Sequence, residues 1–159
     1  TYVLANDTDS TNPVVANATP LELIDTRFAL EPHICRLAVL NARNQDLEKA
    51  EELLMQMENC LEEPARFSFF DTSFHTLLAE TTGNRLLIWI VAQINGVRNQ
   101  DQWARMRQLT LNETTIAEYN AHHRKVFEAI RNREPERAAT IMKQHLEAAR
   151  LSLTRAAST

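Results

Sequence analysis

Apolar residues recur every three or four positions along most of the chain after residue 19, which is the spacing of one face of an α-helix. Thr19 suits the N-cap of the first such stretch, and Pro20 suits its first turn. We expect Pro32 to interrupt this helix, because proline lacks the backbone donor and clashes with the preceding turn. The pattern predicts seven helices, over residues 20–31, about 33–44, about 46–60, 64–82, about 85–108, about 113–132 and about 135–156.

Turn-forming residues separate these stretches and leave only short connections. Gly83 can adopt the left-handed conformation that ends many helices, and Asn84 can cap the helix that follows. Pro64 and Pro135 suit first-turn positions. The chain has only two glycines and is rich in residues that lose little on entering a helix. We therefore predict an all-α fold, an antiparallel bundle of about six or seven helices.

The first 19 residues follow a different pattern. Residues 4–19 mix Asn, Asp, Ser, Thr and Pro without a sustained apolar period, which is typical of a linker. Residues 1–3, Thr-Tyr-Val, favour a strand and are expected to be the tail of a preceding domain. With 44% hydrophobic residues, the chain can bury one sizeable core. One helical domain is predicted over residues 20–159.

Composition excludes several functions. The formal net charge of −4 and the pI near 5.7 leave no basic surface for a phosphate backbone, so this chain is not expected to bind DNA by itself. Cys35 and Cys60 lack the spacing of thiolate zinc sites and are interpreted as packed, reduced thiols. No apolar run approaches the ~20 residues of a membrane span, and the N-terminus lacks a signal-peptide pattern. We expect a soluble, cytoplasmic protein with no membrane contact.

Four polar side chains lie on otherwise apolar helix faces. Asp71 and His75 are four residues apart and therefore project from the same face of one helix. His123 and His145 occupy the apolar faces of the last two helices, whereas His122 is turned about 100° away from His123. One carboxylate and three imidazoles suit Zn²⁺, Ni²⁺, Mn²⁺ or Fe²⁺. The spacing alone also fits histidines that are hydrogen-bonded in the core or buried at an interface.

Arg27 is a further anomaly, because it places a permanent charge in the apolar face of the first helix. A guanidinium group can hold a carboxylate ligand through two parallel hydrogen bonds. The alternative is an ion pair with Asp25, Glu31 or an acidic residue of another helix. The sequence leaves both interpretations open.

Three stretches carry a resemblance to a known family. They are LIDTRFALEPHICRLAVLNA at residues 23–42, DTSFHTLLAETTGNRLL at residues 71–87 and HRKVFEAIRNREPERAATIMKQHL at residues 123–146. In this order they resemble the opening helices, the Asp-His helix and the closing helices of the C-terminal effector-binding domain (FCD) of GntR-type transcription regulators of the FadR subgroup. The resemblance covers residues from about 20 to 155.

The resemblance implies a metal site and an effector site. The implied metal ligands are Asp71, His75, His123 and His145. Arg27 would face the carboxylate of a small organic acid effector, with Asn84 and Asn95 as further contacts. The ion would be Zn²⁺, Ni²⁺, Mn²⁺ or Fe²⁺, because such ligand sets accept several divalent metals.

The resemblance also implies a regulator rather than an enzyme. The protein would form a homodimer and bind operator DNA through an N-terminal winged helix-turn-helix domain, of which this chain would retain only the tail at residues 1–3. The effector would control DNA binding allosterically. Two other functions remain open. A metal-dependent enzyme on a helical bundle is one, although the chain lacks HExxH and the paired ExxH motifs of di-iron bundles. A metal-free helical dimerisation domain is the other.

Overall fold

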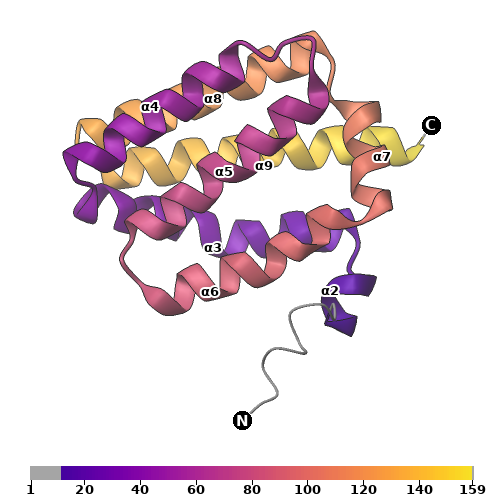
Figure 1. Ribbon diagram of the computed structural model, residues 1–159, viewed down its shortest axis with the longest axis horizontal. Helices are drawn as coiled ribbons and strands as arrows, with labels where there is room; N and C mark the ends of the chain where they lie inside the picture. Colours follow the sequence, from indigo (N-terminus) through magenta and orange to yellow (C-terminus); the bar gives the residue numbers. More distant parts are fainter. Residues whose placement is uncertain (1–11, 159) are drawn as a thin grey trace.

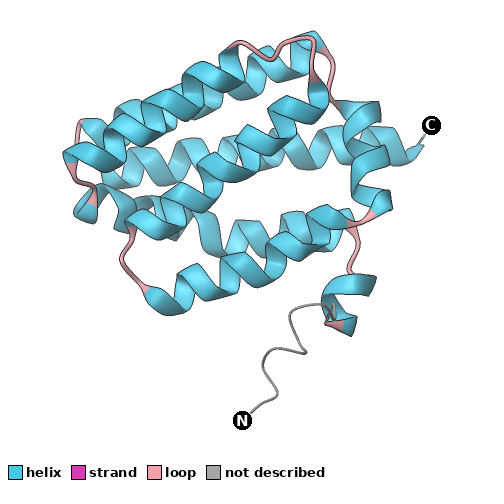
Figure 2. Ribbon diagram, in the orientation of Figure 1, coloured by secondary structure: helices cyan, strands magenta, loops and turns pink. Residues whose placement is uncertain are grey.

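Helices dominate the computed structural model, which describes residues 12–158 and contains no strand within them (Figure 1; Figure 2). The all-α class is therefore confirmed. The elements are α2 (Pro13–Asn17), α3 (Pro20–Asn41), α4 (Asn44–Glu58), α5 (Pro64–Thr81), α6 (Arg85–Ile94), the 3-10 helix η1 (Asn95–Asn99), α7 (Asp101–Thr110), α8 (Glu113–Arg131) and α9 (Pro135–Ser158).

Sequence signals mark the start of α3 and the connection between α5 and α6. The Thr19 side chain accepts from the backbone N–H of Glu22, and the Glu22 carboxylate accepts from the N–H of Thr19, which completes a capping box at the start of α3. Gly83 has a φ of 69° after α5, in the left-handed region that glycine adopts without strain. Asn84 then accepts from the N–H groups of Leu86 and Leu87.

Pro32 does not interrupt the first helix, and this prediction was wrong. The residues predicted as two helices form one, α3, with Pro32 buried inside it. An internal proline costs about 3 kcal/mol, chiefly through one lost backbone hydrogen bond and a steric clash. Packing of α3 along α9, α5 and α8 offsets that cost, because the helix buries ten residues along its length.

The single helix predicted over residues 85–108 was also wrong, because the chain breaks into α6, η1 and α7. Gln100 is extended, with φ −78° and ψ 148°, and its side-chain amide donates to the carbonyl oxygens of Val15 and Ala16 at 2.6 and 3.0 Å. A Cβ at Gly96 would lie 2.8 Å from Cγ1 of Val15, so glycine permits this close approach of α2. Contacts distant in sequence thus decide the break.

The expected linker over residues 4–19 contains the short helix α2, which the sequence pattern did not reveal. Val15 and Ala18 pack against a small apolar cluster formed by Leu23, Val97 and Trp103. Residues 1–3, which were predicted to end a preceding domain, lie outside the residues that the structure describes. Residues 4–11, the first half of the expected linker, also lie outside them.

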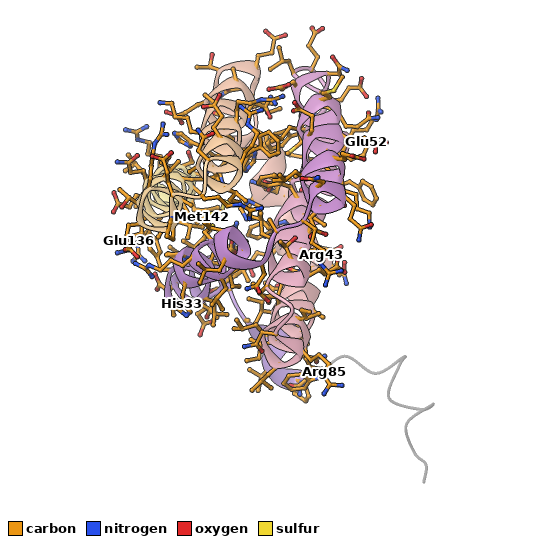
Figure 3. All side chains as sticks on the ribbon, turned by 90° about the vertical axis from the view of Figure 1, so that its left-hand side faces the viewer. His33, Arg43, Glu52, Arg85, Glu136 and Met142 are labelled. Carbon is orange, nitrogen blue, oxygen red and sulfur yellow. The ribbon has the colours of Figure 1, made fainter. Side chains whose placement is uncertain are left out.

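The main core lies between α3, α4, α5, α8 and α9, in which α3 packs on α9, α5 and α8, and α4 packs on α5 and α8. Its largest fully buried side chains include Phe67, Phe74 and Met142. Met142 lies among the helices in Figure 3, whereas the exposed Glu52 and Arg85 lie at the periphery. Burial of these apolar surfaces is the dominant favourable contribution to folding. Within the described residues, no helix is both long and apolar enough to cross a membrane.

Candidate metal centre

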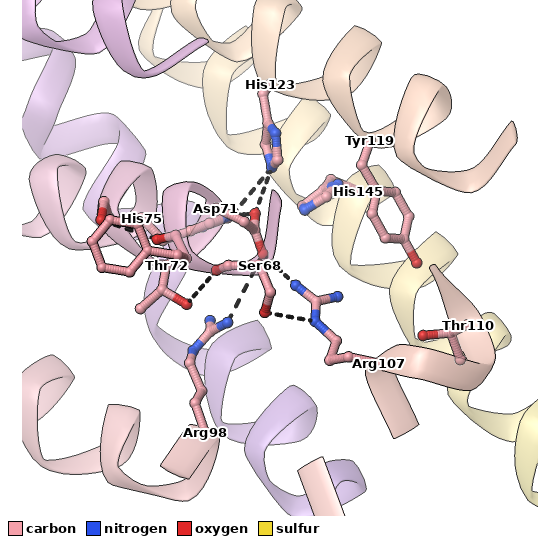
Figure 4. A network of polar contacts seen from close by, with 12 residues as sticks. Ser68, Asp71, Thr72, His75, Arg98, Arg107, Thr110, Tyr119, His123 and His145 are labelled. Atoms are coloured by element: carbon pink, nitrogen blue, oxygen red, sulfur yellow. Dashed lines mark hydrogen bonds and ion pairs between the residues drawn. The ribbon is translucent and has the colours of Figure 1, made fainter. Parts of the chain in front are cut away.

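Three helices bring the four predicted ligands together. Asp71 and His75 come from α5, His123 from α8 and His145 from α9 (Figure 4). Each residue is at most 5% exposed. One possible ligand atom from each lies within 4.8 Å of those from the other three. The cluster could therefore bind a metal ion, which the sequence spacing alone left undecided.

The innermost atoms of this cluster are mutually close and incompletely satisfied. Oδ1 of Asp71 lies 3.2 Å from Nε2 of His75 and 3.1 Å from Nε2 of His123, and the two Nε2 atoms lie 3.3 Å apart. Among the described residues, Asp71 Oδ1 and His123 Nδ1 are buried without a hydrogen bond of good geometry. Buried polar atoms without a partner are rare and costly. A shared cation would satisfy the oxygen and nitrogens together, so the donor set fits a divalent metal.

His75 is oriented by a carboxylate on the side away from Asp71. Its Nδ1 lies 2.5 Å from Oε1 of Glu31, and Arg27 Nε donates to Oε2 of the same carboxylate at 2.5 Å. Glu31 is itself buried. A carboxylate at one ring nitrogen is the usual second partner of a metal-binding histidine, because it fixes the ring and makes the other nitrogen a better donor. This arrangement directs Nε2 of His75 toward Asp71 and His123.

Burial and neighbouring charges shift the pKa values of all four residues, though not in the same direction. Burial and the nearby His123 and His75 hold the pKa of His145 well below its usual value, and burial likewise lowers the pKa of His123. Burial opposes ionisation of Asp71, but His75 and other positive groups overcome it and hold the Asp71 pKa well below its usual value. Burial opposes protonation of His75, but Glu31 and Asp71 outweigh it and raise the His75 pKa. The low pKa values of His123 and His145 favour neutral rings, and that of Asp71 favours a carboxylate, as metal binding requires. His75 would lose its proton on binding a metal ion.

Two more arginines approach the other carboxylate oxygen of Asp71, Oδ2. Arg107 Nη2 of α7 donates to Asp71 Oδ2 at 2.6 Å, whereas Arg98 Nη1 of η1 lies 3.9 Å from the same oxygen (Figure 4). The side chain of Arg98 is only 6% exposed. Burial, together with the positive charge of Arg27, lowers the pKa of Arg98 to about 9, which still leaves the group charged at neutral pH.

The predicted effector residues occupy different positions. Arg27 is paired with Glu31, one of the two alternatives that the sequence allowed, and its Nη2 lies 3.4 Å from both ring nitrogens of His75. Asn95 donates to Thr76 Oγ1 and accepts from Arg98 Nε. Asn84 is exposed and caps α6. Effector binding by these residues stays a prediction.

Sequence reasoning missed several groups around the cluster, among them Arg98, Arg107 and His122. His122 Nδ1 lies 3.1 Å from Nδ1 of His145 although the two histidines at 122 and 123 point in different directions. Arg98 lies on η1 and Arg107 on α7, the elements that replace the single helix expected over residues 85–108. No local pattern marks them. Glu31 carried a signal, since it lies one helical turn after Arg27.

Comparison with known proteins places the chain in a domain family and finds relatives that are transcription regulators. The FCD domain family matches residues 22–148. The "Uxu operon transcriptional regulator" of Escherichia coli (strain K12) is 30% identical over 154 residues, which cover 92% of this chain and 60% of the relative. The "Exu regulon transcriptional regulator" of the same organism is 27% identical over 142 residues, or 89% of this chain and 54% of the relative. Both names describe regulators rather than enzymes, in agreement with the expectation that this chain is not an enzyme.

Solved structures show the same fold. "Streptococcus agalactiae GntR" matches with a TM-score of 0.69 and 23% identity over 91% of this chain and 61% of that one. "E. coli McbR/YncC" matches with a TM-score of 0.72 and 17% identity over 84% of this chain and 63% of that one. The chain thus spans little more than half the length of the curated relatives that it matches.

Proposed function

The chain belongs to the FCD domain family of GntR-type regulators, and we propose that it is a sensor domain that holds a divalent metal ion and binds a small carboxylate effector. One observation carries the metal site: four buried donors from α5, α8 and α9 converge within 4.8 Å. The proposed ligands are Asp71, His75, His123 and His145. Zn²⁺, Ni²⁺, Mn²⁺ and Fe²⁺ all accept such nitrogen and oxygen donors. A bound ion would supply positive charge beside which an acidic effector can bind.

The whole protein would be longer than this chain, because the relatives are. We propose that it binds operator DNA in the cytoplasm through an N-terminal domain, as a homodimer, and that the effector changes the affinity for DNA. Such coupling requires two states in which the effector has different contacts. Arg27 could contact the effector only by exchanging its present partner, Glu31.

Contacts around η1 support a route by which ligand binding could move α2 and the start of α3. Val97 and Trp103 pack with Leu23 at the start of α3 and with Val15 of α2. Gln100 holds the backbone of α2 through two hydrogen bonds. A shift of η1 and α7 on ligand binding would therefore move α2 and the first turn of α3, which lead toward the proposed DNA-binding domain.

Elemental analysis of the purified chain, prepared without a nickel column, tests the metal proposal. We expect about one equivalent of a divalent metal per chain, and its loss in His123→Ala and His145→Ala. The matched control is His33→Ala, since His33 is exposed on α3 and takes no part in the cluster. Absence of metal from the unaltered chain, even after incubation with Zn²⁺ or Mn²⁺, would refute the metal site and leave the fold assignment intact.

A further inference from the structure

The positive charges around the cluster exceed the negative ones. Three guanidinium groups, those of Arg27, Arg98 and Arg107, approach it, whereas two carboxylates, those of Glu31 and Asp71, face them. Arg27 is paired with Glu31, and Arg107 with Asp71. Arg98 Nε donates to the side-chain oxygen of Asn95, and Arg98 Nη1 lies 3.9 Å from Asp71 Oδ2, the oxygen that already accepts from Arg107. Arg98 and Arg107 therefore share one carboxylate, which leaves one positive charge in excess among these five groups.

Two buried donors near this excess charge lack acceptors. Within residues 12–158, neither Arg98 Nη1 nor Trp103 Nε1 has a hydrogen-bond partner. Trp103 is 3% exposed, and its ring packs against the guanidinium groups of both Arg98 and Arg107, with Cζ atoms 5.3 and 5.2 Å from the ring centroid. An unpaired buried donor costs free energy, and an unpaired buried charge costs more. A ligand that supplies acceptors and negative charge would remove both costs.

The space for such a ligand adjoins these donors. Two cavities, of about 400 and 450 Å³, lie between α5, η1 and α7 and share Ser68, Arg98 and Trp103 in their walls. Arg107 lines the first and hydrogen-bonds to Ser68 Oγ. Figure 4 shows Arg98 and Arg107 reaching toward Asp71 from η1 and α7, with Ser68 between them. A small organic molecule fits this volume, because ligand pockets commonly measure about 300–1,000 Å³.

We infer that Arg98 and Trp103 bind the carboxylate of the effector, beside the two cavities between α5, η1 and α7. The carboxylate would accept from Arg98 Nη1 and Trp103 Nε1, and the rest of the ligand would occupy the cavity beside Ser68. Arg27 would keep its pairing with Glu31 and act by fixing His75. This inference rests on the proposed effector function and assigns the primary anion contact to a residue that no local sequence pattern marks.

Tartrate and its neutral counterpart threitol provide matched probes, because they share a hydroxylated four-carbon chain and differ in the carboxylates. In a Trp89→Phe background, Trp103 is the remaining tryptophan of the chain, and its fluorescence reports on the cavity. With metal saturating and ionic strength held constant, we expect tartrate to change this fluorescence saturably and threitol to have no effect. Equal responses to both, or no response to tartrate, would overturn the inference.

Arg98→Gln tests the assignment directly. We expect a loss of tartrate affinity of at least about tenfold, because hydrogen bonds to charged groups are the strong ones. The unliganded variant should unfold at a higher urea concentration than its parent, since the substitution removes an unbalanced buried charge. Arg105→Gln, which alters an exposed arginine of α7, is the control and should bind as the parent does.

Tartrate affinity and metal content of Arg98→Gln, measured together, separate this inference from the metal proposal. Unchanged tartrate affinity would refute the role of Arg98 and would leave the metal proposal intact. Loss of metal in Arg98→Gln would likewise count against the inference, because it would show that Arg98 maintains the metal cluster rather than an independent anion site.

Discussion

The buried Arg27–Glu31 pair should show strong energetic coupling. Arg27 is 3% exposed and Glu31 is 8% exposed, and the two side chains meet at 2.5 Å next to His75. Glu31→Gln leaves the guanidinium of Arg27 buried without its carboxylate, and breaking one partner of a buried pair costs about 3–5 kcal/mol. Replacing both residues, in Arg27→Met with Glu31→Gln, removes the unpaired charge and should cost much less than the sum of the two single changes.

Urea denaturation of metal-free protein, followed by circular dichroism, measures this coupling through a double-mutant cycle. We expect a coupling energy of about 2–3 kcal/mol, at the upper end of the range for residues in direct contact. The exposed Arg36–Glu136 pair is the control, and Glu136→Gln should leave the unfolding midpoint nearly unchanged because solvent screens that pair. Additivity of the two single changes to within about 0.5 kcal/mol would refute the reasoning, since it would mean that Arg27 does not depend on Glu31.

Two further predictions concern metal removal and pH. At a metal concentration of about 100 times Kd, binding contributes about 2.7 kcal/mol, and the melting temperature of a chain of this length changes by about 2–4 °C per kcal/mol. Chelation should therefore lower the melting temperature by about 5–11 °C. Equal melting temperatures with and without chelator, measured by differential scanning calorimetry, would contradict this prediction. Burial raises the pKa of the Cys35 thiol, so the unfolded chain releases this proton first as pH rises. The contribution of Cys35 to the free energy of unfolding should be complete below pH ~8.5 and should decline above that pH by up to about 1.4 kcal/mol per pH unit. Urea denaturation at several pH values should therefore show a shallower decline for Cys35→Ala than for the unaltered chain.

The sequence predicted the cluster of candidate ligands because each of these four residues lies on an apolar helix face. An apolar stripe marks the side of a helix that will be buried, so Asp71, His75, His123 and His145 had to point inward once the fold was a bundle. Their convergence at one point required the packing of α5 against α8 and α9, which periodicity does not define. The family resemblance supplied that step.

The break between α6 and α7 could not be predicted in the same way. Residues 85–108 contain no proline, and the glycine at 96 is tolerated in a helix at a cost of about 1 kcal/mol. What favours the break is the contact of Gly96 with Val15 and of Gln100 with the backbone of α2, about 85 residues earlier in the chain. Tertiary contacts of this kind override local propensity. The positions of Arg98 and Arg107 follow from the break and were therefore also missed.

The placement of charge around the cluster leads us to expect that the metal ion and the anion bind with positive cooperativity. The four proposed ligands contribute one carboxylate, and the arginines already exceed the two buried carboxylates by one. A divalent ion would raise the positive excess further and strengthen the attraction for an acidic ligand in this low-dielectric site. An anion at Arg98 would in turn reduce repulsion between Arg98 and the ion. By linkage, metal must then raise the affinity for the anion by the same factor as the anion raises the affinity for metal. Arg98 lies on η1, whereas the proposed metal ligands lie on α5, α8 and α9. The shared stabilisation would therefore draw η1 toward the bundle, and Gly96 and Gln100 would transmit that movement to α2.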